Sequence, residues 1–87
     1  MAHILHVLKD ANPAEALAVI SKEANGSVQN VSILLIQEAV RLQPDLPVTI
    51  YVLEEDAQKR GIKAGFEPIN YTKMLDLILS SHSVVVW

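Results

Sequence analysis

The stretch VTIYVLEEDAQKRGI, residues 48–62, decides the fold class of this chain. Its first six residues, 48–53, are β-branched, aromatic or aliphatic and carry no charge, which is typical of a strand covered on both faces. Three acidic residues follow at 54–56, two basic residues stand at 59–60, and Gly61 comes next. This charge order suits the two ends of a helix, and glycine is favoured just after a helix. The stretch therefore predicts a buried strand that leads directly into a short surface helix.

A strand covered on both faces implies helices above and below a mostly parallel sheet. The rest of the chain repeats the same alternation of strand and helix. Strands are expected at 2–8, 31–36, 48–53 and 84–87, with an irregular edge strand within 66–71 that contains Pro68. Helices are expected at 13–24, 39–43, 54–60 and after Thr72. The sequence thus predicts a three-layer α/β/α domain, flavodoxin-like in appearance, with four to five strands and right-handed crossovers.

Two helix starts carry capping signals. Asn12 as N-cap, Pro13 at the first helical position and Glu15 two residues later predict the start of the first helix. Thr72 is expected to cap the last helix. A short polar connection is expected at 27–30 and a loop at 62–65. The apolar stripe expected on the last helix consists of Met74, Leu75, Ile78 and Leu79.

The composition limits the function classes. Eighty-seven residues suffice for one domain, 1–87, and a 51% hydrophobic share is above the usual value, which suggests a partner surface. A net charge of −3 with seven Lys plus Arg argues against direct nucleic-acid binding. No apolar run is long enough to span a membrane, and no secretion signal is recognised, so we expect a cytoplasmic protein. The chain has no cysteine, so it can form no disulfide or persulfide itself.

Candidate functional residues follow the predicted strands. Ligands and partners gather at the carboxyl ends of parallel strands. Gln37 and Glu38 follow one such strand, and Glu55 and Asp56 follow the next. The acidic residues 54–56 are also explained as a helix start, and this structural interpretation is favoured over acid/base catalysis.

Three more candidates lie outside that cluster. His6, in the first strand, is more simply a structural histidine than a proton relay or anion contact. Tyr71 and Trp87 are amphipathic aromatic residues, and Trp87 suits either the core or an interface. We find no nucleophile elbow, phosphate-binding loop or metal-ligand spacing, and therefore predict no catalytic, cofactor or metal residues.

Four segments resemble the DsrH/TusB family of the DsrE/DsrF/DsrH group of sulfur-relay proteins. Residues 5–8 (LHVL) are similar to a family L-H-x-L opening, and residues 34–40 (LLIQEAV) resemble its L-L-x-Q-[DE]-G-V segment. Residues 52–62 resemble the family pattern v-y-x-L-x-x-D-x-x-x-R-G-[LI]. Tyr71-Thr72 and the final Trp87 are similar to the end of TusB-type chains. Ala39 stands where the family has glycine, so the backbone of that turn is expected to differ.

The resemblance implies a role in an assembly. In the family, three related subunits form a heterohexamer with two copies of each. Sulfur travels as a persulfide on a cysteine of the DsrE/TusD subunit, for tRNA wobble-uridine 2-thiolation through TusE or for sulfur oxidation. A chain without cysteine would be a non-catalytic subunit that packs against DsrE/TusD-like and DsrF/TusC-like partners.

Two other functions stay open. The chain could form a stand-alone homo-oligomer that acts as an interaction or regulatory module. Alternatively, it could be a small enzyme that uses His6 with Glu38 or Glu55 as acid and base, which requires these groups to converge on a cleft.

Overall fold

The computed structural model describes residues 3–26, 30–63 and 65–87, and within them it confirms the α/β class. The strands form one five-stranded sheet in the order β4-β3-β2-β1-β5, and every neighbouring pair is parallel. The strands are β1 (His3–Leu8), β2 (Asn30–Leu35), β3 (Thr49–Leu53), β4 (Glu67–Ile69) and β5 (Ser83–Val86). The helices are α1 (Ala14–Asn25), α2 (Glu54–Lys59), α3 (Tyr71–Ser80) and the 3₁₀ helix η1 (Gln37–Arg41).

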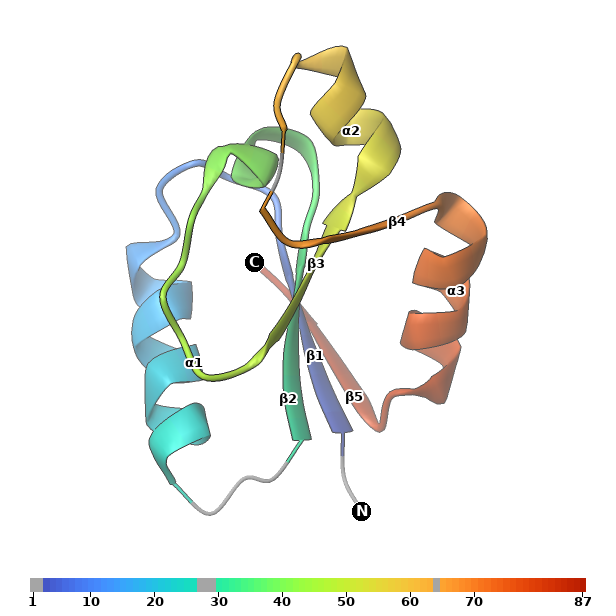
Figure 1. Cartoon of the computed structure of the whole chain (residues 1–87). Coiled ribbons are helices and arrows are strands. Elements are labelled where there is room, and N and C mark those ends of the chain that lie inside the picture. Colours follow the sequence, from blue (N-terminus) through green and yellow to red (C-terminus); the bar gives the residue numbers. More distant parts are fainter. Residues whose placement is uncertain (1–2, 27–29, 64) are drawn as a thin grey trace.

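Helices cover both faces of the sheet, as the sequence predicts. Figure 1 shows α1 on one side of the sheet and α3 on the other, with α2 and η1 at the end to which the strands point. Leu8, Ile33 and Val52 pack with Ile20 of α1 in one core layer, whereas Leu5, Leu34 and Leu77 form the other. Successive strand residues alternate between these two layers, because side chains alternate across a sheet.

The stretch that decides the fold class behaves as predicted. β3 ends at Leu53 and α2 begins at Glu54 with no linker between them. Val52 and Leu53 are buried, and the first turn of α2 carries three acidic residues. Gly61 has a φ of +65°, so the residue that ends this segment does adopt the left-handed conformation that glycine favours.

Both predicted caps are wrong. Pro13, not Asn12, occupies the N-cap position of α1, with φ −90° and ψ 54°, and no side chain caps this helix. The N-cap of α3 is Asn70, whose side chain accepts a hydrogen bond from the backbone N–H of Lys73 at 2.8 Å. Asn70 follows β4 immediately and starts the helix two residues before Thr72, and asparagine is a better cap than threonine.

Two predicted helices are also corrected. The expected helix at 39–43 is the 3₁₀ helix η1, which begins two residues earlier, at Gln37. On α3 the buried residue is Leu77, with Met74 and Ile78 partly buried beside it. Leu75 is 55% and Leu79 82% exposed, so half of the expected stripe faces outward. The face that meets the sheet therefore includes Leu77 in place of Leu75 and Leu79.

The remaining expectations concern segment ends and connections. The predicted edge strand containing Pro68 is β4, at the edge of the sheet. Ala2, most of the polar connection at 27–30 and Ala64 of the expected loop lie outside the described residues. Among the residues that are described, no helix combines the length and hydrophobicity needed to cross a membrane.

Candidate functional site

The candidate site lies at the carboxyl edge of the sheet, which we define as η1, α2 and the residues that directly follow β1, β2 and β3. All strands are parallel, so their carboxyl ends meet at one edge, and Figure 1 shows η1 and α2 there. α2 and η1 are in contact with each other. The structure therefore brings Gln37 and Glu38 close to Asp56, as their positions in the sequence predict.

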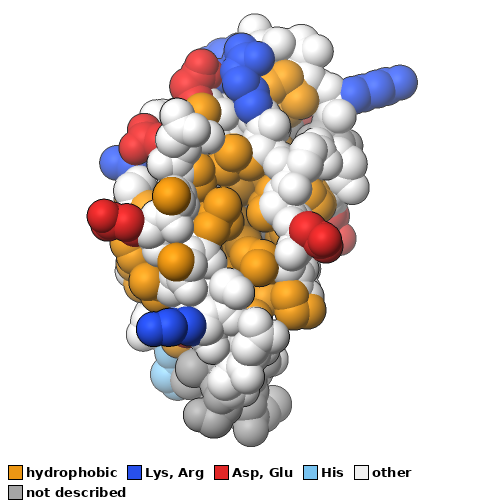
Figure 2. All heavy atoms as spheres, turned by 90° about the vertical axis from the view of Figure 1, so that its left-hand side faces the viewer, with side chains coloured by type: hydrophobic (Ala, Val, Ile, Leu, Met, Phe, Trp, Pro, Cys, Tyr) orange, Lys and Arg blue, Asp and Glu red, His pale blue; other side chains and the backbone are white. Residues whose placement is uncertain are grey.

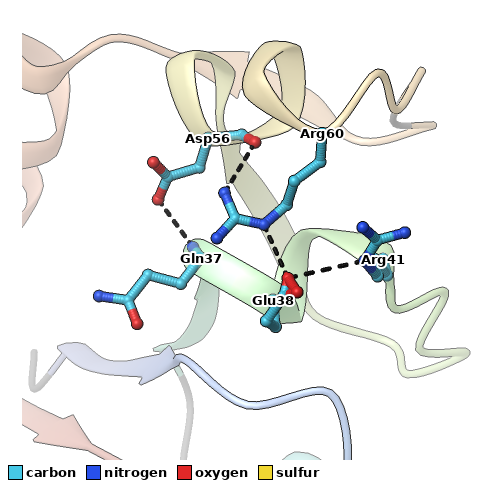
Figure 3. A network of polar contacts seen from close by, with 5 residues as sticks. All are labelled: Gln37, Glu38, Arg41, Asp56 and Arg60. Atoms are coloured by element: carbon cyan, nitrogen blue, oxygen red, sulfur yellow. Dashed lines mark hydrogen bonds and ion pairs between the residues drawn. The ribbon is translucent and has the colours of Figure 1, made fainter.

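A buried carboxylate fixes the turn after β2. Asp56 is only 8% exposed. Its Oδ2 accepts a hydrogen bond from the backbone N–H of Gln37 at 2.7 Å (Figure 3). Gln37 has a φ of +52°, the left-handed region that costs a non-glycine residue about 1–2 kcal/mol. A charge-assisted hydrogen bond offsets a penalty of that size. Asp56 therefore holds this connection in a conformation that Gln37 alone disfavours.

The positive φ of this turn lies at Gln37 and not at Ala39. Ala39 stands where glycine is expected, yet it is fully buried and its N–H donates to the carbonyls of Ile36 and Lys9. The left-handed conformation occurs two residues earlier, at Gln37. A Cβ at residue 39 is therefore compatible with this turn.

Arg60 joins η1 to the end of α2. Its Nε donates to Glu38 Oε2 at 2.8 Å, and its guanidinium also donates to the backbone carbonyl of Asp56 at 3.2 Å (Figure 3). Arg41 approaches the same Glu38 oxygen at 3.7 Å. The hydrogen bond from Arg60 is the largest cause that lowers the pKa of Glu38 below its ordinary value of 4.5. Glu38 and Arg41 are about half exposed, so this part of the edge is accessible to a partner.

Glu55 and Tyr71 belong to a different hollow. They line a depression of about 350 Å³ beside the start of α2, together with Glu54, Gln58 and Asn70. Tyr71 is 45% exposed there. The structure thus places Glu55 and Tyr71 near each other but outside the network around Asp56.

His6 and Trp87 form a third cluster, within the core. His6 is 1% exposed, and its Nε2 lies 2.6 Å from Oε1 of Glu23 on α1. The indole N–H of Trp87 donates to His6 Nδ1 at 3.0 Å, and the two ring planes are inclined by 23°. An indole N–H can only donate, so Nδ1 must be unprotonated and Nε2 must carry the proton that Glu23 accepts. Both ring nitrogens are therefore occupied.

Neither predicted catalytic partner of His6 is among its hydrogen-bond partners in the described residues. An acid/base enzyme would need His6 near Glu38 or Glu55, but its partner is Glu23. Sequence reasoning missed Glu23, although a buried histidine needs a polar partner and a carboxylate on the neighbouring helix is a natural one. Trp87 ties the end of β5 to β1, and it also borders an open hollow of about 360 Å³ at the start of α1.

One face of the molecule has an apolar hollow. Figure 2 shows hydrophobic side chains gathered in the middle of the α1 face, between rims that carry charged residues. Partly buried residues pack over the core on this face of the sheet, among them Leu17, Leu42, Leu46 and Val48.

Within the described residues, no group of three or more His, Asp or Glu side chains is placed to hold a metal ion.

Comparison with known proteins gives a likeness of fold. No protein-family model matches the sequence, and no curated protein matches it. The chain is similar in structure to the ychN protein from E. coli. The crystal structure of ychN superposes with a TM-score of 0.71 at 18% sequence identity, over 100% of both chains. This likeness shows that the two chains share an α/β fold over their whole length.

Proposed function

We propose that this chain is a non-catalytic subunit of a DsrE/DsrF/DsrH-type sulfur-relay complex, of the DsrH/TusB kind, in the cytoplasm. It packs against DsrE/TusD-like and DsrF/TusC-like subunits, and its carboxyl edge faces the cleft in which sulfur is transferred. The persulfide resides on a cysteine of a partner. The complex serves tRNA wobble-uridine 2-thiolation or sulfur oxidation.

One combined observation supports this proposal. The chain shares its fold with ychN over its whole length, and it contains no cysteine. A persulfide carrier needs a thiolate, and the 87 residues contain none. Their one buried histidine is bonded to Glu23 and Trp87, so it is not available as a base. What the domain does offer is a rigid edge and apolar surface, which are the properties of an assembly subunit.

The carboxyl edge suits contact with a partner. Gln37 is exposed and stands in a backbone conformation fixed by Asp56, so its side chain is presented from a rigid position. Glu38 and Arg41 beside it offer one negative and one positive charge for specific recognition. The apolar hollow on the α1 face adds hydrophobic contact area (Figure 2).

A pair of lysine substitutions tests this assignment. Gln37→Lys adds one positive charge at the carboxyl edge. Asn25→Lys adds the same charge at the exposed end of α1, near the amino ends of the strands. We expect Gln37→Lys to weaken binding to co-purified DsrE-like and DsrF-like subunits by about tenfold. Asn25→Lys should bind as the unmodified chain does. Equal binding by both variants, measured by titration in solution, would contradict a partner contact at this edge.

A further inference from the structure

The two edges of the sheet differ in their capacity to accept another strand. β4 has three residues, includes Pro68, and carries an exposed glutamate at Glu67. Proline lacks an N–H and charged side chains discourage pairing, so this edge is protected. β5 has neither feature, and within the described residues its side away from β1 has no strand beside it. β5 is therefore the edge that is open to pairing.

The exposed side chains of β5 are apolar. Val84 is 37% and Val86 58% exposed. They are in register with Leu5 and Val7, which belong to the core layer that includes Leu77 of α3. Val84 and Val86 therefore lie on the α3 face of the sheet.

α3, on the same face of the sheet, also carries exposed apolar side chains. Leu75 and Leu79 are one helical turn apart and are 55% and 82% exposed. The connection from β4 through α3 to β5 is expected to be right-handed. In that arrangement the side of α3 that carries Leu75 and Leu79 faces the β5 edge of the sheet. We call these four residues the β5 patch: Leu75, Leu79, Val84 and Val86. None of these four side chains is charged, and the acidic residue beside them on α3 is the exposed Asp76. The patch itself therefore adds no like charges to a contact between two chains of net charge −3.

We infer that the β5 patch joins two copies of this chain, with β5 paired antiparallel to β5 of the second copy. A two-fold axis perpendicular to the sheet keeps both α3 helices on one face of the joined sheet. Opposed residues of the two β5 strands must then point to the same face of the joined sheet. Because side chains alternate along a strand, the sequence numbers of two opposed residues must differ by zero or by an even number. The register that sets Val84 against Val86 of the second copy meets this condition and places Val85 on the axis.

The available area is sufficient for such a contact. The four side chains together expose on the order of 400 Å² in each copy, as judged from their exposed fractions. Two copies, with the backbone of both β5 strands added, reach the roughly 1,000 Å² that a specific interface needs. This inference rests on the proposed function, in which the chain is an assembly subunit, and names the surface between its two copies.

Cysteine cross-linking tests the register directly, because the chain has no cysteine of its own. Directly opposed residues of antiparallel strands have Cα atoms about 4.5–5.5 Å apart, within the range of a disulfide. Val85→Cys should therefore form a disulfide-linked dimer under mild oxidation. Glu67→Cys, in β4 at the other edge of the sheet, leaves the β5 patch intact and should still self-associate, but it should form no disulfide-linked dimer. Cross-linking of Glu67→Cys as readily as of Val85→Cys would overturn the inference.

A second pair of variants tests the contact without a covalent bond. Val86→Lys places a charge in the β5 patch and should weaken self-association at least about tenfold in sedimentation experiments. Glu67→Lys is the matched control and should self-associate as the unmodified chain does. A Val86→Lys variant that self-associates normally would overturn the inference. Binding of the same variant to DsrE-like and DsrF-like subunits is measured separately, so failure of the copy contact and failure of the proposed function are distinguishable.

Discussion

The cluster around His6 and the network around Asp56 use similar groups for different purposes. In the first, a histidine 1% exposed is bonded to Glu23 and Trp87 and joins β1, α1 and the end of β5 inside the molecule. In the second, the Asp56 carboxylate fixes the backbone of Gln37, whose own side chain stays free at the surface (Figure 3). Complete internal pairing indicates a structural role, whereas a fixed backbone with exposed side chains indicates a recognition surface.

The largest effect is expected from His6→Ala. The substitution leaves Glu23 and the Trp87 indole without a partner and opens a cavity in the core, so it should lower the free energy of unfolding by about 3 kcal/mol. Urea denaturation followed by tryptophan fluorescence measures this change. His82→Ala, in an exposed position, is the control and should have no comparable effect. A loss of less than about 1 kcal/mol would contradict the structural role of His6.

A smaller effect is expected from Asp56→Ala, which removes the acceptor of the Gln37 N–H. We expect a loss of about 2 kcal/mol in unfolding free energy. Gln37→Gly relieves the left-handed conformation and should itself be neutral or stabilising by about 0.5 kcal/mol. In the Gln37→Gly background, Asp56→Ala should cost less than it does alone, because there is less strain to hold. Simple additivity in this double-mutant cycle would show that Asp56 does not hold strain at Gln37.

The smallest effect concerns Glu38 and depends on pH. Because Arg60 lowers the pKa of Glu38 in the folded state, the ionised form contributes stability above the ordinary value of 4.5, and this contribution is lost as pH falls through the lowered pKa. The difference in stability between the unmodified chain and Glu38→Gln should therefore be present at neutral pH and fade in acid. A difference that grows as the pH falls would have the wrong sign.

Sequence patterns predicted the fold because the decisive features are local. The uncharged run at 48–53, the acidic start of α2 and Gly61 each act within a few residues, and all three are found as expected. The convergence of Gln37 and Asp56 also follows from strand order alone. The partners of His6 and Arg60 could not be predicted in this way, since Glu23, Trp87 and Glu38 are 17, 81 and 22 residues away. Such pairs depend on how α1, β5 and η1 pack.

Native mass spectrometry of the chain co-expressed with DsrE-like and DsrF-like subunits tests the central claim most directly. We predict a mixed complex with two copies of each chain, in which added sulfur appears as a mass increase on a partner and never on this chain. A homo-oligomer that excludes both partners would contradict the relay-subunit function and favour a stand-alone interaction module.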